Sequence, residues 1–417
     1  MKRILPLLLI LTILFSLTAC LPEGPTENTD PSSQFPTVDE GTGLKEQIKL
    51  PTTHTTVSEE DYYQYSFLSA SEKVACDRLR KGISEGKNNV DVSDLKIPKD
   101  TATRITRVVT ADNPQFFYLS KTISYTYNPD TNCLLAYQPM YTDGTAVDTF
   151  DGKTFTEAAD RSKIDGQIRQ FNAKIDEVVS AIPVTATQEE KEKQIHDYIV
   201  SHVEYDTDGA NHSEQAVLPR GYDAYGALCE GKATCEGYAK LFQYLCYCVG
   251  IQCTQVSGQA DGGPHMWNAL LLNEKWYLTD ITWNDPVGNE SQFPTYDYYN
   301  LPMTEMNKNH VPDATSLHVP ECTADDLTYY KNYALYTNGT GAPVNYESIL
   351  DRLAAEKGTY VPLYTANLTE DVREYASYHF FDANAPMMKY IAQKGYDFSF
   401  QTSFVISGSY IYLLLEE

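Results

Sequence analysis

The chain has 417 residues, of which 42% are hydrophobic and 21% are charged, values that are ordinary for a globular protein of two to three domains. Its formal net charge is −25 at pH 7. A protein this acidic is repelled by nucleic acids and by anionic lipid headgroups, so nucleic-acid binding is disfavoured.

The first twenty residues have the pattern of an export signal. Two basic residues precede an uncharged apolar run over 4–17, which is too short for a spanning helix and predicts a signal peptide over residues 1–19. The sequence Leu17-Thr18-Ala19-Cys20 resembles a bacterial lipobox, which implies lipidation of Cys20 and a location on the extracytoplasmic face of the cell membrane. A plain cleaved signal in which Cys20 is incidental is the alternative.

The next two segments differ sharply in composition. Residues 20–58 are rich in Pro, Thr, Ser and acidic residues, and we expect them to form a flexible tether. Residues 59–150 combine helical spacing over 67–83 with strand-like runs between 116 and 141, which predicts a small α+β domain.

The rest of the chain divides at about residue 312. Helices are expected over 156–182 and 189–203, leading into a domain over 151–312 that contains the candidate catalytic residues. Residues 313–417 are predicted to be a C-terminal α+β extension that ends in two strand-like runs.

Cys235 stands at the start of the most strongly patterned helix. Apolar residues repeat at helical spacing from Tyr238 to Val249, Thr234 is a suitable N-cap, and Gly250 is a suitable stop. The helix dipole and unsatisfied N–H groups favour a thiolate at this position. For a lone cysteine, however, a buried structural role would be an equally good interpretation.

The residues downstream favour the catalytic interpretation. Asn273-Glu274 is a predicted hairpin turn between two strands, of which the first begins at His265 and the second ends at Asp280. Antiparallel pairing therefore brings His265 and Asp280 to one end of the hairpin. Thiol catalysis requires such a pair, because an imidazole must deprotonate the thiol and a carboxylate must hold the imidazole in the correct tautomer.

Three sequence blocks carry a resemblance to a known family. The blocks 234–239 (TCEGYA), 265–268 (HMWN) and 276–283 (WYLTDITW) are similar to the bacterial transglutaminase-like core, and 195–199 resembles the helix that precedes it. The resemblance implies an α+β, papain-like core with the catalytic cysteine at a helix N-terminus packed on an antiparallel sheet. It also implies that Cys235 is the nucleophile, His265 the base and Asp280 the orienting carboxylate.

The resemblance predicts a cell-surface thiol enzyme that acts on amide or peptide bonds through a cysteine thioester. Peptidase, amidase and acyl-transfer activities all remain open, and the expected substrate is a protein, a peptide or a cell-wall peptide. The backbone N–H of Cys235 is one expected oxyanion donor, and Tyr225 and Trp267 are candidates for the second. The alternatives are a non-catalytic module that binds wall peptides or glycans on the same fold, and a latent enzyme whose cleft is covered.

The nine cysteines suggest no metal or cofactor site. Cys246, Cys248 and Cys253 lack a Cys-x-x-Cys pair, which argues against structural zinc. If Cys20 is lipidated and Cys235 is catalytic, seven cysteines remain, so at least one more thiol is expected to be free. Export permits disulfides, but their connectivity stays open.

Overall fold

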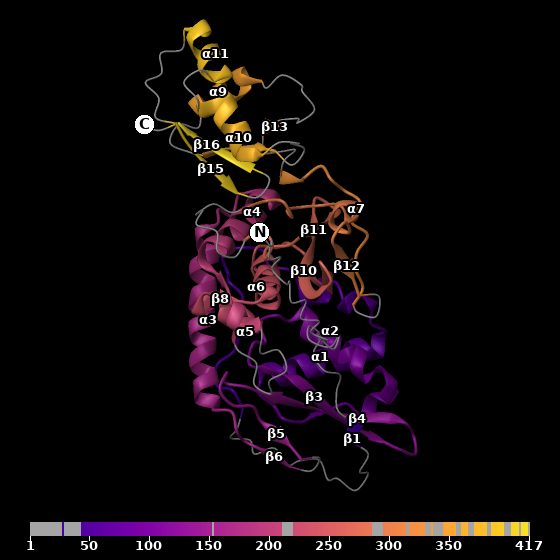
Figure 1. Ribbon diagram of the computed structural model, residues 1–417. Coiled ribbons are helices and arrows are strands. Elements are labelled where there is room, and N and C mark those ends of the chain that lie inside the picture. The colour runs from indigo at the N-terminus through magenta and orange to yellow at the C-terminus, as the bar shows by residue number, and fades with distance from the viewer. Residues whose placement is uncertain are drawn as a thin grey trace, which may run out of the picture.

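The computed structural model has an α+β architecture (Figure 1). It describes residues 27–28, 43–151, 154–210, 220–285, 295–313, 317–329, 335–336, 345–355, 360–365, 371–381, 385–395, 402–407 and 410–415. The predicted signal peptide and Cys20 lie outside these residues. Among the helices that are described, none has the length and apolar character needed to cross a membrane.

The N-terminal part contains two helices beside an antiparallel hairpin. The helices are α1 (Ala70–Ser84) and α2 (Ala102–Asp112), and the hairpin is β3 (Leu119–Asn128) with β4 (Cys133–Tyr141). Short strands β1 (Glu27–Asn28) and β2 (Val90–Asp91) complete a sheet of order β1-β3-β4-β2.

Helix α1 begins later than the residue 67 expected from the sequence. Ser69 and Glu72 form a capping box. The side chain of each residue accepts the backbone N–H of the other, and this fixes the start of the helix. The helical spacing of the sequence predicts that Val74, Leu79 and Ile83 point inward. Leu79 and Ile83 are buried as expected, but Val74 is 42% exposed. The prediction for Val74 was wrong because it lies beside, and not on, the buried face defined by Leu79 and Ile83.

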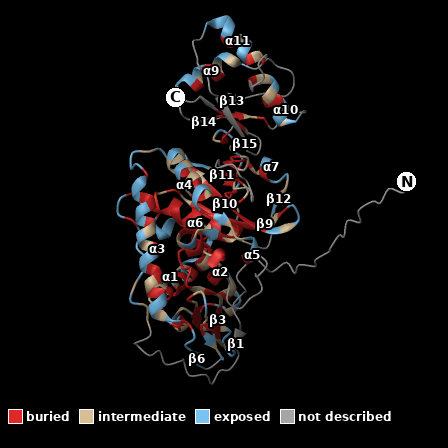
Figure 2. Cartoon of the chain, turned by 60° about the vertical axis from the view of Figure 1, so that its left-hand side comes forward, coloured by how far each residue is buried: buried red, intermediate tan, exposed pale blue. Residues whose placement is uncertain are grey.

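Two long helices lead into the central part of the chain. They are α3 (Arg161–Ala181) and α4 (Gln188–His202), close to the expected ranges. Helix α3 runs along one side of the molecule, and much of its outer face is exposed (Figures 1 and 2). A capping box between Thr187 and Glu190 explains where α4 begins.

The central sheet is antiparallel and carries the candidate catalytic residues. Its strands are β9 (Cys253–Ala260), β10 (Gly263–Leu272), β11 (Lys275–Thr279) and β12 (His310–Pro312), in the order β11-β10-β9-β12. Helix α6 (Cys235–Cys248) packs against β9 and β10. The predicted fold class, an α+β core with Cys235 at a helix N-terminus packed on an antiparallel sheet, is confirmed.

The expected hairpin turn is present between β10 and β11. Asn273 and Glu274 both have positive φ angles, of 48° and 63°, which is the conformation of a two-residue turn that matches strand twist. The turn sets the register, which pairs Asn268 with Thr279.

One hydrophobic core joins the N-terminal and central parts. It runs from Val57 to Ile281 and includes buried residues on both sides of the predicted boundary at residue 150, such as Tyr141 and Ile164. Buried residues accordingly continue from α1 and α2 to α6 and its sheet without a break (Figure 2).

Residues 43–58 pack against the rest of the protein, so the prediction of a flexible tether is wrong for this segment. The backbone N–H groups of Lys45 and Glu46 donate to the Asp165 carboxylate of α3, and Val57 N–H donates to the carbonyl of Tyr247 in α6. Val57 is also part of the core. Composition failed here because backbone hydrogen bonds to distant residues can order a segment that has few apolar side chains of its own.

The C-terminal region has a separate core and its own sheet of order β13-β14-β16-β15. Apolar side chains between Ile349 and Leu413 form that core. The elements are β13 (Leu335–Tyr336), α9 (Tyr346–Ala355), β14 (Tyr360–Tyr364), α10 (Val372–Ala376), α11 (Pro386–Lys394), β15 (Thr402–Ser407) and β16 (Tyr410–Leu415).

Short elements connect these parts. They are β5 (Thr149–Phe150), β6 (Phe155–Thr156), β7 (Glu204–Tyr205), α5 (Thr207–Ala210), β8 (Lys232–Ala233) and α7 (Met303–Met306).

Candidate active site

Cys235 is the first residue of α6, as the sequence predicts. Thr234 occupies the N-cap position in an extended conformation, but its hydroxyl donates to the carbonyl of Gly221 (3.3 Å) and does not cap the helix. The amides of the first turn are therefore not satisfied by the Thr234 side chain. They and the helix dipole favour a negative charge beside Cys235.

A glycine allows the chain before α6 to approach the helix closely. A Cβ atom at Gly237 would lie 2.3 Å from the carbonyl oxygen of Gly221 and 2.9 Å from the Cβ of Ala233. Only glycine fits between these groups, and the contact holds the N-terminal turn of α6, with Cys235, against the residues that precede it.

His265 contacts both of the other predicted catalytic residues. Its Nε2 lies 2.6 Å from Oδ2 of Asp280, and its ring is in hydrogen-bond contact with the side chain of Cys235. A carboxylate can only accept, so Nε2 carries the proton that it donates to Asp280. Nδ1 of His265 is then left with a lone pair for the thiol of Cys235.

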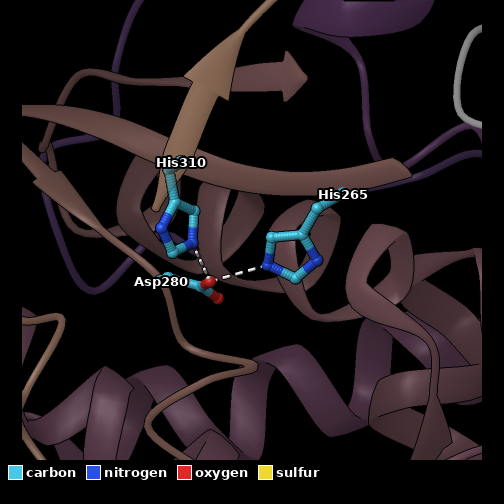
Figure 3. A group of neighbouring side chains, drawn as sticks. All are labelled: His265, Asp280 and His310. Carbon is cyan, nitrogen blue, oxygen red and sulfur yellow. Dashed lines mark hydrogen bonds and ion pairs between the residues drawn. The ribbon is translucent and has the colours of Figure 1, made fainter. Parts of the chain in front are cut away.

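Asp280 is fully buried, and both of its carboxylate oxygens accept hydrogen bonds. Oδ1 accepts the backbone N–H of Trp283 (3.1 Å), and Oδ2 accepts Nε2 of His265 and also Nε2 of His310 (3.0 Å). Figure 3 shows the two imidazole rings approaching the same carboxylate oxygen from different strands. A buried carboxylate with this many donors is held as an anion.

The electrostatics of the pair favour an ionised state. Burial alone would raise the pKa of Asp280, but the charges and hydrogen bonds of His265 and His310 lower it to about 2. Burial alone would lower the pKa of His265, but Asp280 and Cys235 raise it to about 10. The arrangement therefore stabilises an imidazolium at His265 between two groups that can carry negative charge.

Aromatic rings pack around the two imidazoles. The ring centroid of His265 lies 6.0 Å from Trp267 and 5.7 Å from Trp283, and His310 lies 5.0 Å and 4.6 Å from the same two rings. Trp276 packs instead against Tyr63, at 4.8 Å. Of the three tryptophans that follow one another in the sequence, two therefore enclose the site.

Gly258 on β9 leaves room for this packing. A Cβ atom there would lie 2.8 Å from Cη2 of Trp267 and 2.2 Å from the carbonyl oxygen of Val311. In the sheet register, Gly258 is opposite His265 on one side and Pro312 on the other. The missing side chain thus lets β12 and Trp267 come close to the strand that separates them.

A second set of polar residues supports the loop that follows Asp280. The side chain of Asn284 donates to Nε2 of His196 on α4 (3.1 Å) and accepts the backbone N–H of Tyr298 (2.9 Å). Glu192, on the same helix, accepts hydrogen bonds from Tyr299 and Asn300. Helix α4 therefore contacts the connection between β11 and β12 at two places, at Asn284 and at Tyr299 with Asn300.

The two candidates for a second oxyanion donor have different surroundings. The hydroxyl of Tyr225 donates to Gln170 on α3 (2.7 Å), so its single proton is already used and the expectation for Tyr225 loses its support. Trp267 is fully buried, and its indole N–H has no hydrogen-bond partner within the described part of the chain. Trp267 therefore keeps a free donor next to His265.

His265, Asp280 and His310 also offer ligand atoms that lie within 4.8 Å of one another. In the hydrogen-bonded arrangement, however, both Nε2 atoms carry protons directed at Oδ2 of Asp280, so neither nitrogen presents a lone pair there. The site as arranged is a pair of imidazoles on one carboxylate.

Eight of the nine cysteines lie in the described residues, and none of these eight forms a disulfide. Burial raises the pKa of Cys229 to about 12 and raises that of Cys322 to about 12. Cys235 differs from these thiols because it contacts an imidazole.

His310 is the residue of the site that the sequence did not indicate. It lies 30 positions after Asp280, on a three-residue strand, and no motif includes it. What distinguishes His310 is its complete burial, which is not visible in the sequence.

Comparisons with known proteins agree with this description of the core. Residues 177–281 match the model of the transglutaminase-like superfamily. Over 172 residues the chain is 31% identical to the kyphoscoliosis peptidase of Homo sapiens and 30% identical to that of Mus musculus, covering 36% of this chain and 25% of each relative. The chain therefore spans about a quarter of the length of the curated relatives it matches.

Among solved structures, a crystal structure of a TGase aligns with 57% of this chain and 56% of its own, at 14% identity and a TM-score of 0.27. The family match concerns the core: residues 177–281 are similar to the transglutaminase-like superfamily, and Cys235, His265 and Asp280 all lie within them.

Proposed function

We propose that the protein is a thiol enzyme that cleaves or transfers acyl groups at amide or peptide bonds, with Cys235 as nucleophile, His265 as general acid–base and Asp280 as orienting carboxylate. The observation that carries the proposal is a single continuous contact: Cys235 at a helix N-terminus touches His265, whose Nε2 lies 2.6 Å from a buried carboxylate. The similarity to the kyphoscoliosis peptidases over 172 residues supports the same reaction class.

The geometry suggests how each group acts. Nδ1 of His265 takes the proton of Cys235, and the thiolate attacks the carbonyl carbon of the substrate to form a tetrahedral oxyanion. The backbone N–H of Cys235 is one donor for that oxyanion. His265 then gives its proton to the leaving amine as the C–N bond breaks, which leaves a thioester on Cys235.

Resolution of the thioester decides between hydrolysis and transfer. Water, deprotonated by His265, would release the carboxylic acid, and a primary amine would give a new amide. Both routes use the same three residues, so the proposal covers peptidase, amidase and acyl-transfer activity on protein, peptide or cell-wall peptide substrates.

The first test is the pH dependence of Cys235 alkylation by iodoacetamide, followed by peptide mass spectrometry. An activated thiolate should react fast well below the free-thiol pKa of about 8.5, and the reaction at low pH should collapse in His265→Ala. His202→Ala is the matched control, because His202 is exposed at the end of α4, where its Nδ1 bonds the carbonyl of Tyr198 (2.8 Å).

Acyl transfer can be tested without a known substrate. p-Nitrophenyl acetate should acylate Cys235 with a burst of p-nitrophenolate, and the burst should be absent in Cys235→Ser. If Cys235 of the wild-type protein reacts like an ordinary thiol and gives no burst, the enzyme proposal is wrong, and binding of wall peptides or glycans becomes the function to measure.

We also propose that the protein is anchored by lipid at Cys20 on the extracytoplasmic face of the membrane. The support is the lipobox-like sequence before Cys20 and the apolar run that precedes it. Metabolic labelling with an alkynyl fatty acid should label the wild-type protein and not Cys20→Ala. Label that persists in the variant would contradict the anchor at this residue.

A further inference from the structure

We propose that His310 is a positioning residue of the active site, which fixes the Asp280 carboxylate and shares the carboxylate oxygen that His265 uses. The inference rests on the proposed function for its catalytic meaning, although the hydrogen-bond arrangement itself can be tested without any substrate. It concerns a residue outside the segment that matches the family model, which ends at residue 281.

The geometry is that of two donors on one acceptor atom. Nε2 of His265 lies 2.6 Å and Nε2 of His310 lies 3.0 Å from the same Oδ2 of Asp280 (Figure 3). Two donors on one oxygen compete for its electron density. The bond from His310 therefore weakens the attraction of Asp280 for the proton on His265, and at the same time it holds the carboxylate in one orientation.

His310 reaches Asp280 from β12, the strand on the other side of β9 from the strand that carries His265. Strand β12 pairs with β9, and His310 is opposite Ala260, while His265 on β10 is opposite Gly258 of the same strand. Partners in antiparallel strands point to the same face, and residues two apart along a strand do so as well. His265 and His310 therefore project from the same face of the sheet, on both sides of β9.

The far side of the His310 ring is also anchored. Its Nδ1 lies 2.7 Å from Oδ1 of Asn309, and Nδ2 of Asn309 donates to the hydroxyl of Tyr298 (2.7 Å). Trp283 packs against the ring of His310 at 4.6 Å. With bonds at both nitrogens and a ring contact, His310 cannot turn away from Asp280 without breaking buried hydrogen bonds.

Within the described part of the chain, few other titratable groups face this pair. Cys235 approaches from α6 on the side of His265, and the Tyr298 hydroxyl approaches from the connection between β11 and β12. Burial raises the pKa of Tyr298, with further contributions from Asp297, Asp280 and Asp261, so this hydroxyl is neutral in the working pH range. The neighbouring tryptophans carry no charge. The competition at Oδ2 is therefore the main local influence on His265 besides the thiol.

Two substitutions separate the shape of His310 from its hydrogen bond. His310→Phe fills the aromatic surroundings and removes the donor, while His310→Gln keeps an N–H donor and removes the ring. Val311→Ala is the matched control, because Val311 is on the same strand and 62% exposed.

The first readout is the pH profile of Cys235 alkylation. For a thiolate–imidazolium pair, the rate of Cys235 alkylation rises with pH until the pair has formed and then stays on a plateau. The rate changes again at the higher pH where His265 loses its proton. Removing the competing donor should widen this plateau in His310→Phe, by about half a pH unit or more on the alkaline side. His310→Gln and Val311→Ala should keep the wild-type profile. An unchanged or narrower plateau in His310→Phe would overturn the inference.

The second readout is nitrogen-15 NMR of the histidine rings. Nε2 of both His265 and His310 should carry a proton in the resting protein, with assignments taken from His310→Gln and His265→Ala. A His310 ring without a proton at Nε2 would contradict the inference. So would stoichiometric zinc or another transition metal in the purified protein that His310→Phe loses, because His310 would then be a metal ligand.

The two proposals fail in different ways. If Cys235 proves unreactive in the wild-type protein while the NMR titration of His265 moves to higher pH in His310→Phe, the function is wrong and the role of His310 stands. If Cys235 is activated but His265 titrates identically in both proteins, the function stands and the role of His310 is wrong.

Discussion

Nε2 of the buried His265 donates to Oδ2 of the fully buried Asp280 across 2.6 Å, and this bond determines which ring nitrogen faces Cys235. Because the carboxylate can only accept, the proton is on Nε2, and Nδ1 is the basic atom. The orientation of a single imidazole thus links the hairpin of β10 and β11 to the N-terminus of α6.

Asp280→Asn should remove the activation of Cys235 and leave the fold intact. The amide can donate to Nε2, which places the proton on Nδ1 and takes the basic lone pair away from the thiol. The rate constant for alkylation at pH 6 should fall by roughly two orders of magnitude, towards that of an unperturbed thiol.

The control for this experiment is Asp285→Asn. Asp285 lies on the same loop but accepts a hydrogen bond from the Tyr238 hydroxyl, and burial raises its pKa to about 6. This variant should alkylate like the wild type. Equal rates for Asp280→Asn and the wild type would contradict the orienting role of Asp280.

Trp267→Phe tests whether the free indole N–H takes part in catalysis. Trp267 is fully buried, so we expect it to pack behind His265, and the p-nitrophenyl acetate burst should change by less than about tenfold while the melting temperature falls. Removing one oxyanion donor costs about 10²–10³ in rate. A loss of that size at unchanged stability would instead identify the indole as the second donor.

Gly258→Ala should destabilise the protein and disturb the site together. The added Cβ would clash with the carbonyl oxygen of Val311 and with Trp267, neither of which can move without shifting β12. We expect a loss of about 1–3 kcal/mol in the free energy of unfolding, measured with denaturant, and slower alkylation of Cys235.

Gly263→Ala is the comparison, because a Cβ there would meet only the Ala260 carbonyl at an ordinary 3.7 Å. A Gly258→Ala variant as stable as Gly263→Ala would show that β12 does not pack against β9 as described.

Glu192 should make the protein less stable as the pH rises. Burial raises the pKa of Glu192 from 4.5 to about 8, and its Oε1 has no hydrogen-bond partner among the described residues. Between these two pH values the unfolded chain releases a proton that the folded protein retains. The contribution of Glu192 to the free energy of unfolding therefore falls with rising pH, by at most about 1.4 kcal/mol per unit.

Glu192→Gln should remove this slope, so the variant should gain stability relative to the wild type from about pH 5 to pH 8 in urea titrations. Glu189→Gln, a partly exposed position on the same helix, is the control. Parallel pH curves for Glu192→Gln and the wild type would mean that Glu192 is ionised in the folded protein.

The local features of the site could be predicted from the sequence alone. The helix that starts at Cys235 follows from apolar spacing and an N-cap residue, and the meeting of His265 and Asp280 follows from a two-residue turn between strands of similar length. Both depend on residues that are close together in the chain, where secondary-structure geometry leaves few arrangements.

Only the tertiary structure decided the remaining relationships. His310 reaches Asp280 because β12 pairs with β9, a choice of strand order that no local pattern specifies. Residues 43–58 pack on α3 and α6 through backbone groups, which are the same in every sequence. Tyr225 is committed to Gln170 on α3 by a contact 55 positions away in the chain. The sequence by itself therefore determined the helix and hairpin that carry the three predicted catalytic residues, and the long-range packing of the sheet determined what surrounds them.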